Sequence, residues 1–108
     1  MFGNAKNNEP VEALPGVVRR FLAAGAKTLS VEFAIAAGAV VPAHTHPYEQ
    51  TGYLVSGRAR MRIGSEIKEI TSGDAYCIPE NEDHAFEALE NCIVVDCFAP
   101  VRPEYLPG

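Results

Sequence analysis

Residues 44–50 (HTHPYEQ) and residues 73–84 (GDAYCIPENEDH) decide the fold, because together they hold all three histidines of the chain. Residues two apart on a β-strand point to the same side, so His44 and His46 can present two imidazoles to one ion. His84 follows a turn directly and opens a second strand-like run, from which it can reach the same ion. Imidazole nitrogens bind borderline divalent metals well. The arrangement predicts one metal site shared by two strands.

A further ligand is expected in the strand that follows Pro47. If this strand resumes without a bulge, Gln50 shares the face of the histidines and Glu49 points the other way. A bulge near Pro47 would reverse the two side chains, so Glu49 stays the alternative to Gln50. A His-x-His pair also arises by chance, and a histidine near prolines is commonly a hydrogen-bonded or solvated side chain. The placement of all three histidines just after Pro- or Asn-bearing segments favours the metal site.

The rest of the chain has the pattern of an all-β protein. From residue 16 onward, short runs rich in Val, Ile, Phe and Tyr are separated by Gly, Asn and Pro at intervals of roughly ten residues, which is typical of a sandwich or barrel. Residues 29–35 and 58–63 alternate between apolar and polar side chains, so each predicts a strand with one buried face. About eight such strands should close on themselves. The polar face of the second run is expected to be solvated, with a local anion site as the alternative; it consists of Arg58, Arg60 and Arg62.

The length of 108 residues predicts a single domain. Residues 1–15 are polar and without periodicity, so we expect a flexible N-terminal arm before a barrel of residues 16–108. The closing stretch, residues 100–108, contains three prolines and cannot pair as a central strand. It is expected to pack across a barrel mouth or onto a partner.

Composition excludes several classes of function. A formal net charge of -5 disfavours a nucleic-acid partner, because such proteins usually present a basic surface. No apolar run approaches the roughly 20 residues of a membrane span, and the first residues lack a basic and then apolar leader, so a cytoplasmic protein is expected. Three cysteines without a C-x-x-C pair disfavour a disulfide framework. Each lies in an apolar run and is expected to be a buried free thiol; they are Cys77, Cys92 and Cys97.

The two histidine segments resemble the two motifs of the cupin family. Gly38, five residues, His44-x-His46, three residues, Gln50, six residues and Gly57 resemble the first motif. Gly73, five residues, Pro79, four residues and His84 resemble the second. The resemblance implies a single-domain jelly-roll barrel, the double-stranded β-helix. It also implies one divalent metal ion, Mn, Fe, Ni or Zn, bound by His44, His46, Gln50 and His84.

The chain departs from the general cupin pattern at two positions. Gln50 stands where most cupins have a glutamate ligand, and Asn81 replaces a turn glycine. Asparagine tolerates the left-handed conformation well, so the turn is not threatened. With Gln50 every ligand is neutral, and the ion would keep its full charge as a stronger Lewis acid.

The segment around the first motif resembles the pectin-degradation (KdgF-type) cupins more closely. Those proteins use a glutamine ligand and follow the last strand with D-x-F-x-P-x-R, which here spans residues 96–102. The resemblance implies that Asp96, Phe98 and Arg102 line the pocket. It also implies that a small carboxylate sugar, a 4,5-unsaturated uronate, is converted to its open-chain keto form. Tyr48, where relatives often carry histidine, and Pro103, where an acidic residue is common, depart from this branch.

The residues themselves allow these roles without requiring them. Asp96 interrupts an apolar strand, so its carboxylate faces water, pairs with a cation or has a raised pKa that suits proton transfer. Parity places Phe98 on the same face as Asp96. The guanidinium of Arg102 can hold a substrate carboxylate with two hydrogen bonds, or it can be a surface or dimer-contact group.

Three functions compete at this point. The first is a metal-dependent cupin enzyme, expected as a homodimer, that acts on a small sugar acid. The second is a non-catalytic module that binds or senses a small molecule through its metal, since one fold hosts many functions. The third is a metal-dependent oxygenase, which needs a redox-active ion and open coordination positions. A DNA-binding regulator is disfavoured, because the barrel leaves no residues for a helix-turn-helix.

Overall fold

The computed structural model describes residues 1–107, and these residues form ten β-strands and two short 3-10 helices. The 3-10 helices are η1 (Ala5–Asn7) and η2 (Pro103–Tyr105). The strands are β1 (Val11–Leu14), β2 (Val17–Ala24), β3 (Leu29–Ile35), β4 (Val40–His44), β5 (Glu49–Ser56), β6 (Arg58–Ile63), β7 (Glu66–Thr71), β8 (Ala75–Ile78), β9 (His84–Ala88) and β10 (Cys92–Ala99). The all-β fold predicted from the sequence is confirmed. Among residues 1–107, no helix is long and apolar enough to cross a membrane.

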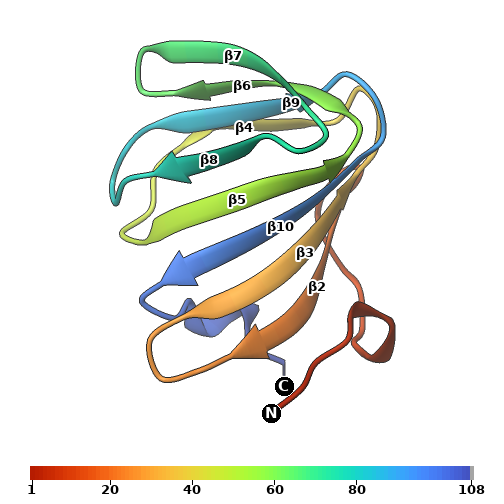
Figure 1. Cartoon of the computed structure of the whole chain (residues 1–108), viewed down its shortest axis with the longest axis vertical. Helices are drawn as coiled ribbons and strands as arrows, with labels where there is room; N and C mark the ends of the chain where they lie inside the picture. Colours follow the sequence, from red (N-terminus) through yellow and green to blue (C-terminus); the bar gives the residue numbers. More distant parts are fainter. Residues whose placement is uncertain (108) are drawn as a thin grey trace.

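The strands, labelled in Figure 1, form two antiparallel sheets whose inner side chains pack into a shared core. One sheet has six strands in the order β1-β2-β3-β10-β5-β8, and the other has four in the order β4-β9-β6-β7. Two pairings in these sheets position the site. His44 at the end of β4 lies opposite His84 at the start of β9. Gly52 of β5 lies between Tyr76 of β8 and Asp96 of β10.

The core lies between the two sheets and follows the alternation of their strands. Strand β10 is the clearest case, because every second side chain from Cys92 to Phe98 is buried. Asp96 occupies one of these buried positions with only 4% of its surface exposed. A carboxylate in such a row is costly unless hydrogen bonds or charges compensate it.

Residues 1–15, where we expected a flexible arm, contain η1 and β1. All four side chains of β1 are exposed. This edge strand is held by main-chain hydrogen bonds to β2. Such bonds do not require alternating apolar side chains, so the sequence contained no pattern that predicted the strand.

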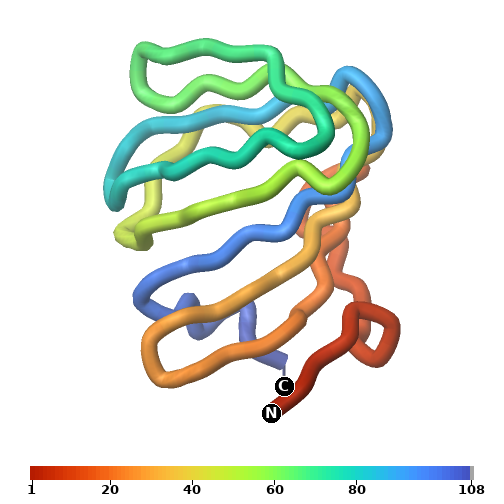
Figure 2. Tube along the Cα trace, viewed as in Figure 1, coloured from red at the N-terminus to blue at the C-terminus, as the bar shows by residue number. Residues whose placement is uncertain are grey.

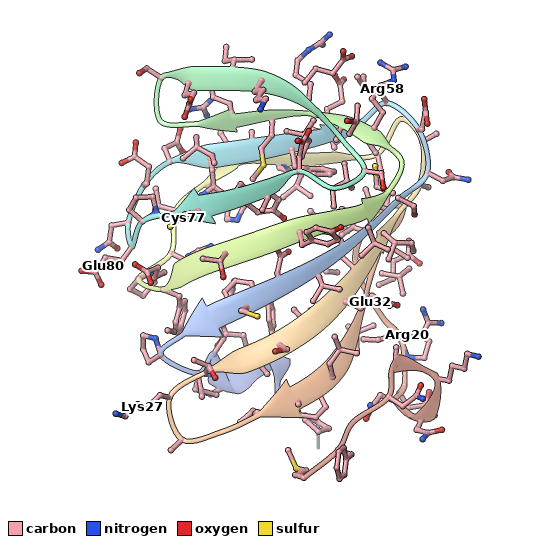
Figure 3. The ribbon with its side chains drawn as sticks, viewed as in Figure 1. Arg20, Lys27, Glu32, Arg58, Cys77 and Glu80 are labelled. Atoms are coloured by element: carbon pink, nitrogen blue, oxygen red, sulfur yellow. The ribbon has the colours of Figure 1, made fainter. Side chains whose placement is uncertain are left out.

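The arginine face of β6 is solvated, as expected. Arg58 contacts Glu69 and Glu90, and it extends away from the sheets at one end of the molecule in Figure 3. Arg60 pairs with Glu87, and Arg62 pairs with Asp83. Because each guanidinium already has an acidic partner, the alternative of a local anion site receives no support.

The C-terminal segment folds back beside β2 and β3, and Figure 2 shows its described part at the same end of the molecule as the N-terminus. Tyr105 of η2 packs edge-on against Phe98 of β10, with 5.4 Å between the ring centroids. It also meets Phe33 of β3, at 6.2 Å. Arg102 and Tyr105 also line the cavity between the sheets, so these two residues of the stretch pack across the barrel mouth. Leu106 and Pro107 are exposed, and Gly108 lies outside the described residues.

Of the three cysteines, only Cys92 is buried; Cys77 is exposed and Cys97 is partly buried. The prediction of three core thiols was therefore wrong for Cys77, which lies on β8 in Figure 3, and for Cys97, which is out of phase with the buried side chains of β10. Ile78, the apolar neighbour of Cys77, is completely buried, and alternation along a strand then sends Cys77 to the outer face.

Candidate metal centre

The three histidines lie close together at one end of the barrel. Their ring centroids are 4.2 Å apart for His44 and His84, 4.8 Å for His46 and His84, and 5.6 Å for His44 and His46. One nitrogen from each ring lies within 4.8 Å of the others, so the three side chains could hold one metal ion. The sequence-based prediction of a histidine cluster from two segments is confirmed. His46 lies beyond the end of β4, however, so the expectation that His44 and His46 share the face of one strand was wrong.

Backbone carbonyls fix the orientation of all three imidazoles. In each ring Nδ1 lies within hydrogen-bonding distance of a carbonyl oxygen two residues away: 2.9 Å for His44 and Pro42, 3.1 Å for His46 and Tyr48, and 2.8 Å for His84 and Glu82. A carbonyl oxygen only accepts, so each Nδ1 must donate its hydrogen. The neutral ring then carries its free lone pair on Nε2, the arrangement that metal-binding histidines adopt.

Burial favours the neutral form of two of these rings. It lowers the pKa of His46, and the positive charges of Arg102 and His44 act in the same direction. Burial also lowers the pKa of His84, again helped by the neighbouring histidines. Only the neutral imidazole can bind a metal, so a lowered pKa favours the metal-binding form at neutral pH.

Gln50 is the residue of β5 that points at the histidines. Its side chain is buried, whereas Glu49 is exposed. The side-chain oxygen Oε1 of Gln50 lies 2.9 Å from Nε2 of His46. Because Nδ1 of His46 donates to a carbonyl, its Nε2 is an acceptor, and two acceptors therefore face each other. A cation between them would turn this repulsion into attraction, so the donor set fits a bound metal ion.

Asp96 holds the other end of the Gln50 amide. The carboxylate accepts hydrogen bonds from Gln50 and from the Tyr76 hydroxyl, whose oxygen is 2.6 Å from Oδ1 of Asp96. Since a carboxylate only accepts, Gln50 must turn its NH2 group towards Asp96 and its oxygen towards the histidines. Sequence reasoning missed Tyr76, although parity with the buried Ile78 would have placed it on the inner face of β8.

Burial raises the pKa of Asp96 from 3.8 to about 6, while the hydrogen bonds from Tyr76 and Gln50 oppose this shift. Burial, together with the negative charge of Asp96, raises the pKa of the Tyr76 hydroxyl well above its usual range, so Tyr76 remains a donor. A carboxyl group that titrates near neutral pH is suited to take up and release a proton.

The raised pKa of Asp96 predicts a pH-dependent stability difference between the metal-free wild type and Asp96→Asn. The folded state holds this proton more tightly than the unfolded state, so the stabilisation is complete below the unfolded pKa of 3.8 and is lost as pH rises through about 6. The free energy of unfolding of the wild type should therefore fall by about 1 kcal/mol between pH 5 and pH 8, relative to that of Asp96→Asn. Urea unfolding of both metal-free proteins at the two pH values measures this change. An equal difference at both pH values would contradict the raised pKa.

Arg102 lies at the same end of the cavity within a group of aromatic rings. Its guanidinium carbon is 4.0 Å from the ring centroid of Tyr105 and 5.0 Å from those of Tyr48 and Phe98. Its Nε is 3.0 Å from a carboxylate oxygen of Glu104. Among residues 1–107 its terminal nitrogens make no hydrogen bond, so they are free to bind a carboxylate with two parallel hydrogen bonds.

The candidate residues surround a cavity of about 340 Å³. Its size suits a small organic ligand. The wall includes six of the seven residues singled out in the sequence: His44, Gln50, His84, Asp96, Phe98 and Arg102. The seventh, His46, reaches Gln50 and packs edge-on against Phe98, with 5.9 Å between the ring centroids. The remainder of the wall is mainly apolar, with residues such as Val17, Ile35, Met61 and Phe86.

Comparison with known proteins finds the same architecture elsewhere. Residues 31–98 match the family model described as the cupin domain. The pectin degradation protein KdgF of Dickeya dadantii (strain 3937) is 29% identical over 93 residues, which cover 84% of each chain. The structure of KdgF from Halomonas sp. has a TM-score of 0.91 at 29% identity and covers 98% of both chains. An RmlC-like cupin from Shewanella frigidimarina NCIMB 400 has a TM-score of 0.91 at 26% identity and covers 97% of this chain and 95% of that one.

Proposed function

The chain belongs to the cupin family, and from this premise we propose that it is a metal-dependent enzyme that opens the ring of a 4,5-unsaturated uronate. One observation carries the proposal: the buried carboxyl of Asp96, whose pKa is raised by burial, and the guanidinium of Arg102 line the same cavity as His44 and His84. The similarity to two KdgF proteins, one of them named a pectin degradation protein, supports a sugar acid derived from pectin as the substrate.

In this proposal His44, His46, His84 and Gln50 hold one divalent ion, which can be Mn, Fe, Ni or Zn. The ion supplies Lewis-acid polarisation of a substrate oxygen when it is bound. Because all four ligands are neutral, they leave its charge undiminished. Gln50 is held in the required orientation by its hydrogen bond to Asp96.

The other residues bind the sugar and move a proton. Arg102 binds the carboxylate of the uronate, and Phe98 forms the wall beside it. Ring opening removes the proton of the C1 hydroxyl and breaks the bond between C1 and the ring oxygen, which leaves an aldehyde at C1. The electron pair stays on the C5 oxygen, and a proton added at C4 completes the ketone. Asp96 takes the first proton and supplies the second, so the reaction is an isomerisation without net proton change.

Loss of the conjugated double bond gives a direct assay. A 4,5-unsaturated galacturonate monomer absorbs in the ultraviolet, and metal-loaded protein should accelerate the decay of this absorbance above the spontaneous rate. The metal-stripped protein is the control and should return the rate to the spontaneous value. No acceleration by protein with confirmed metal content would reject this substrate class.

A metal-dependent binding module without turnover is the second candidate. The mainly apolar wall of the cavity favours it, because such a wall can bind a ligand without contributing to proton transfer. Saturable binding of the uronate by calorimetry, without any acceleration of its decay, would support this candidate instead.

A further inference from the structure

Tyr76 reaches Asp96 from two strands away. It belongs to β8, Asp96 belongs to β10, and β5 lies between them. The two side chains lie on either side of Gly52, which pairs with Tyr76 on one edge and with Asp96 on the other. The hydroxyl oxygen of Tyr76 is 2.6 Å from Oδ1 of Asp96, a length typical of a hydrogen bond to an ionised carboxylate.

Gly52 makes this contact possible because it has no side chain. A β-carbon at residue 52 would overlap Oδ1 of Asp96 together with the hydroxyl oxygen and the adjoining ring carbon of Tyr76. The backbone conformation is ordinary for a strand, so the glycine is needed for space and not for a positive φ angle. The tyrosine ring therefore crosses β5 through the gap that Gly52 leaves.

We propose that Tyr76 is a positioning residue, which fixes the carboxylate of Asp96 in the orientation that the reaction requires. The inference rests on the function proposed above and extends it beyond the residues that line up with known motifs. Asp96 accepts from two donors, Tyr76 and Gln50. Tyr76 holds one oxygen from the β8 side, which stops the carboxylate from rotating. Without it, only the Gln50 amide orients Asp96, and that amide is also required at the histidines.

Tyr76→Phe tests the proposal, because it removes the hydroxyl and keeps the ring that fills the space over Gly52. We expect kcat to fall roughly tenfold to a hundredfold, as small displacements of a reacting group do. Tyr76 is part of the cavity wall, but phenylalanine keeps its ring and the lost hydroxyl is bonded to Asp96, so KM and the metal content should stay within about twofold. A kcat equal to that of the wild type would overturn the proposal.

Tyr53→Phe is the matched control. Tyr53 is the next residue after Gly52 on β5 but points to the outer face, where 49% of its surface is exposed. Loss of this hydroxyl should change neither kcat nor stability. If both tyrosine variants lose activity equally, the effect does not come from the contact with Asp96.

A crystal structure of Tyr76→Phe separates this proposal from the proposed function. The carboxylate of Asp96 should leave its wild-type rotamer or become disordered, and this outcome does not depend on any substrate. A displaced Asp96 in a protein whose wild type shows no turnover would reject the uronate reaction and keep the positioning role. An unmoved Asp96 would reject the positioning role, whatever the activity.

Discussion

Asp96→Asn is expected to lower kcat by roughly 10²- to 10⁴-fold, the range that general acid-base catalysis usually contributes. Asparagine has nearly the same shape as aspartate, and it can still accept the hydrogen bond from Tyr76. It has no proton that it can exchange at neutral pH. The loss should therefore appear in kcat, measured by the decay of ultraviolet absorbance with metal-loaded protein.

Metal content decides how such a loss is interpreted. In Asp96→Asn the new side-chain amide turns an NH2 group towards the NH2 group of Gln50, so the Gln50 oxygen is held less firmly at the histidines. The three imidazoles are still oriented by backbone carbonyls, and we expect about one ion per chain to remain. Asp96→Asn protein with full metal content and wild-type kcat would remove Asp96 from the mechanism.

Asp74→Asn provides the control for this substitution. Asp74 is an aspartate of the turn before β8, where it accepts a hydrogen bond from the backbone of Thr71. Asparagine can accept the same bond, and the residue lies outside the cavity. Its rate should equal that of the wild type. A loss at Asp74 similar to that at Asp96 would indicate a general effect of charge or folding.

The parts of the site that the sequence predicted are those that follow from strand periodicity. A repeat of two places Gln50 on the inner face of β5 and Asp96 beside Phe98 on β10. These relations hold within one strand and need no knowledge of its neighbours. The left-handed turn at Asn81, with φ of 63°, was also predictable from the residue type.

Relations between strands were not accessible in this way. The contact of Tyr76 with Asp96 depends on β8 and β10 flanking β5, and a single sequence does not state that order. The aromatic rings around Arg102 come from the loop before β5, from β10 and from η2. Strand β1 is held by main-chain pairing and leaves no pattern in its side chains.

The structure also explains why an amide suits position 50 better than the carboxylate of most cupins. Asp96 already supplies a buried carboxylate within hydrogen-bonding distance of this side chain. In the metal-free protein a glutamate there would place two carboxylates in contact, which would raise the pKa of one of them. Gln50 avoids this conflict because it offers a donor to Asp96 and an acceptor to the histidines.

His46→Ala should abolish metal loading, with an affinity at least about 100-fold lower than that of the wild type. Removing a group that only orients a metal ligand usually lowers the metal affinity by up to about 100-fold. Removing a ligand itself should lower the affinity further. His46 is the most central of the candidates, because its Nε2 meets Gln50 and its ring packs between His84 and Phe98. Metal content after dialysis, measured by mass spectrometry, gives the result.

Gln50→Ala and Glu49→Ala form a matched pair that tests the ligand set from β5. They are neighbours on β5, but Gln50 is buried beside the histidines and Glu49 is exposed on the other face. Glu49→Ala should keep the metal affinity of the wild type, whereas Gln50→Ala should weaken it less severely than His46→Ala, because three imidazoles remain. Circular dichroism must show that each variant is folded. Stoichiometric metal in folded His46→Ala would disprove the proposed centre, because the remaining residues would then have to bind the ion without the imidazole that faces Gln50.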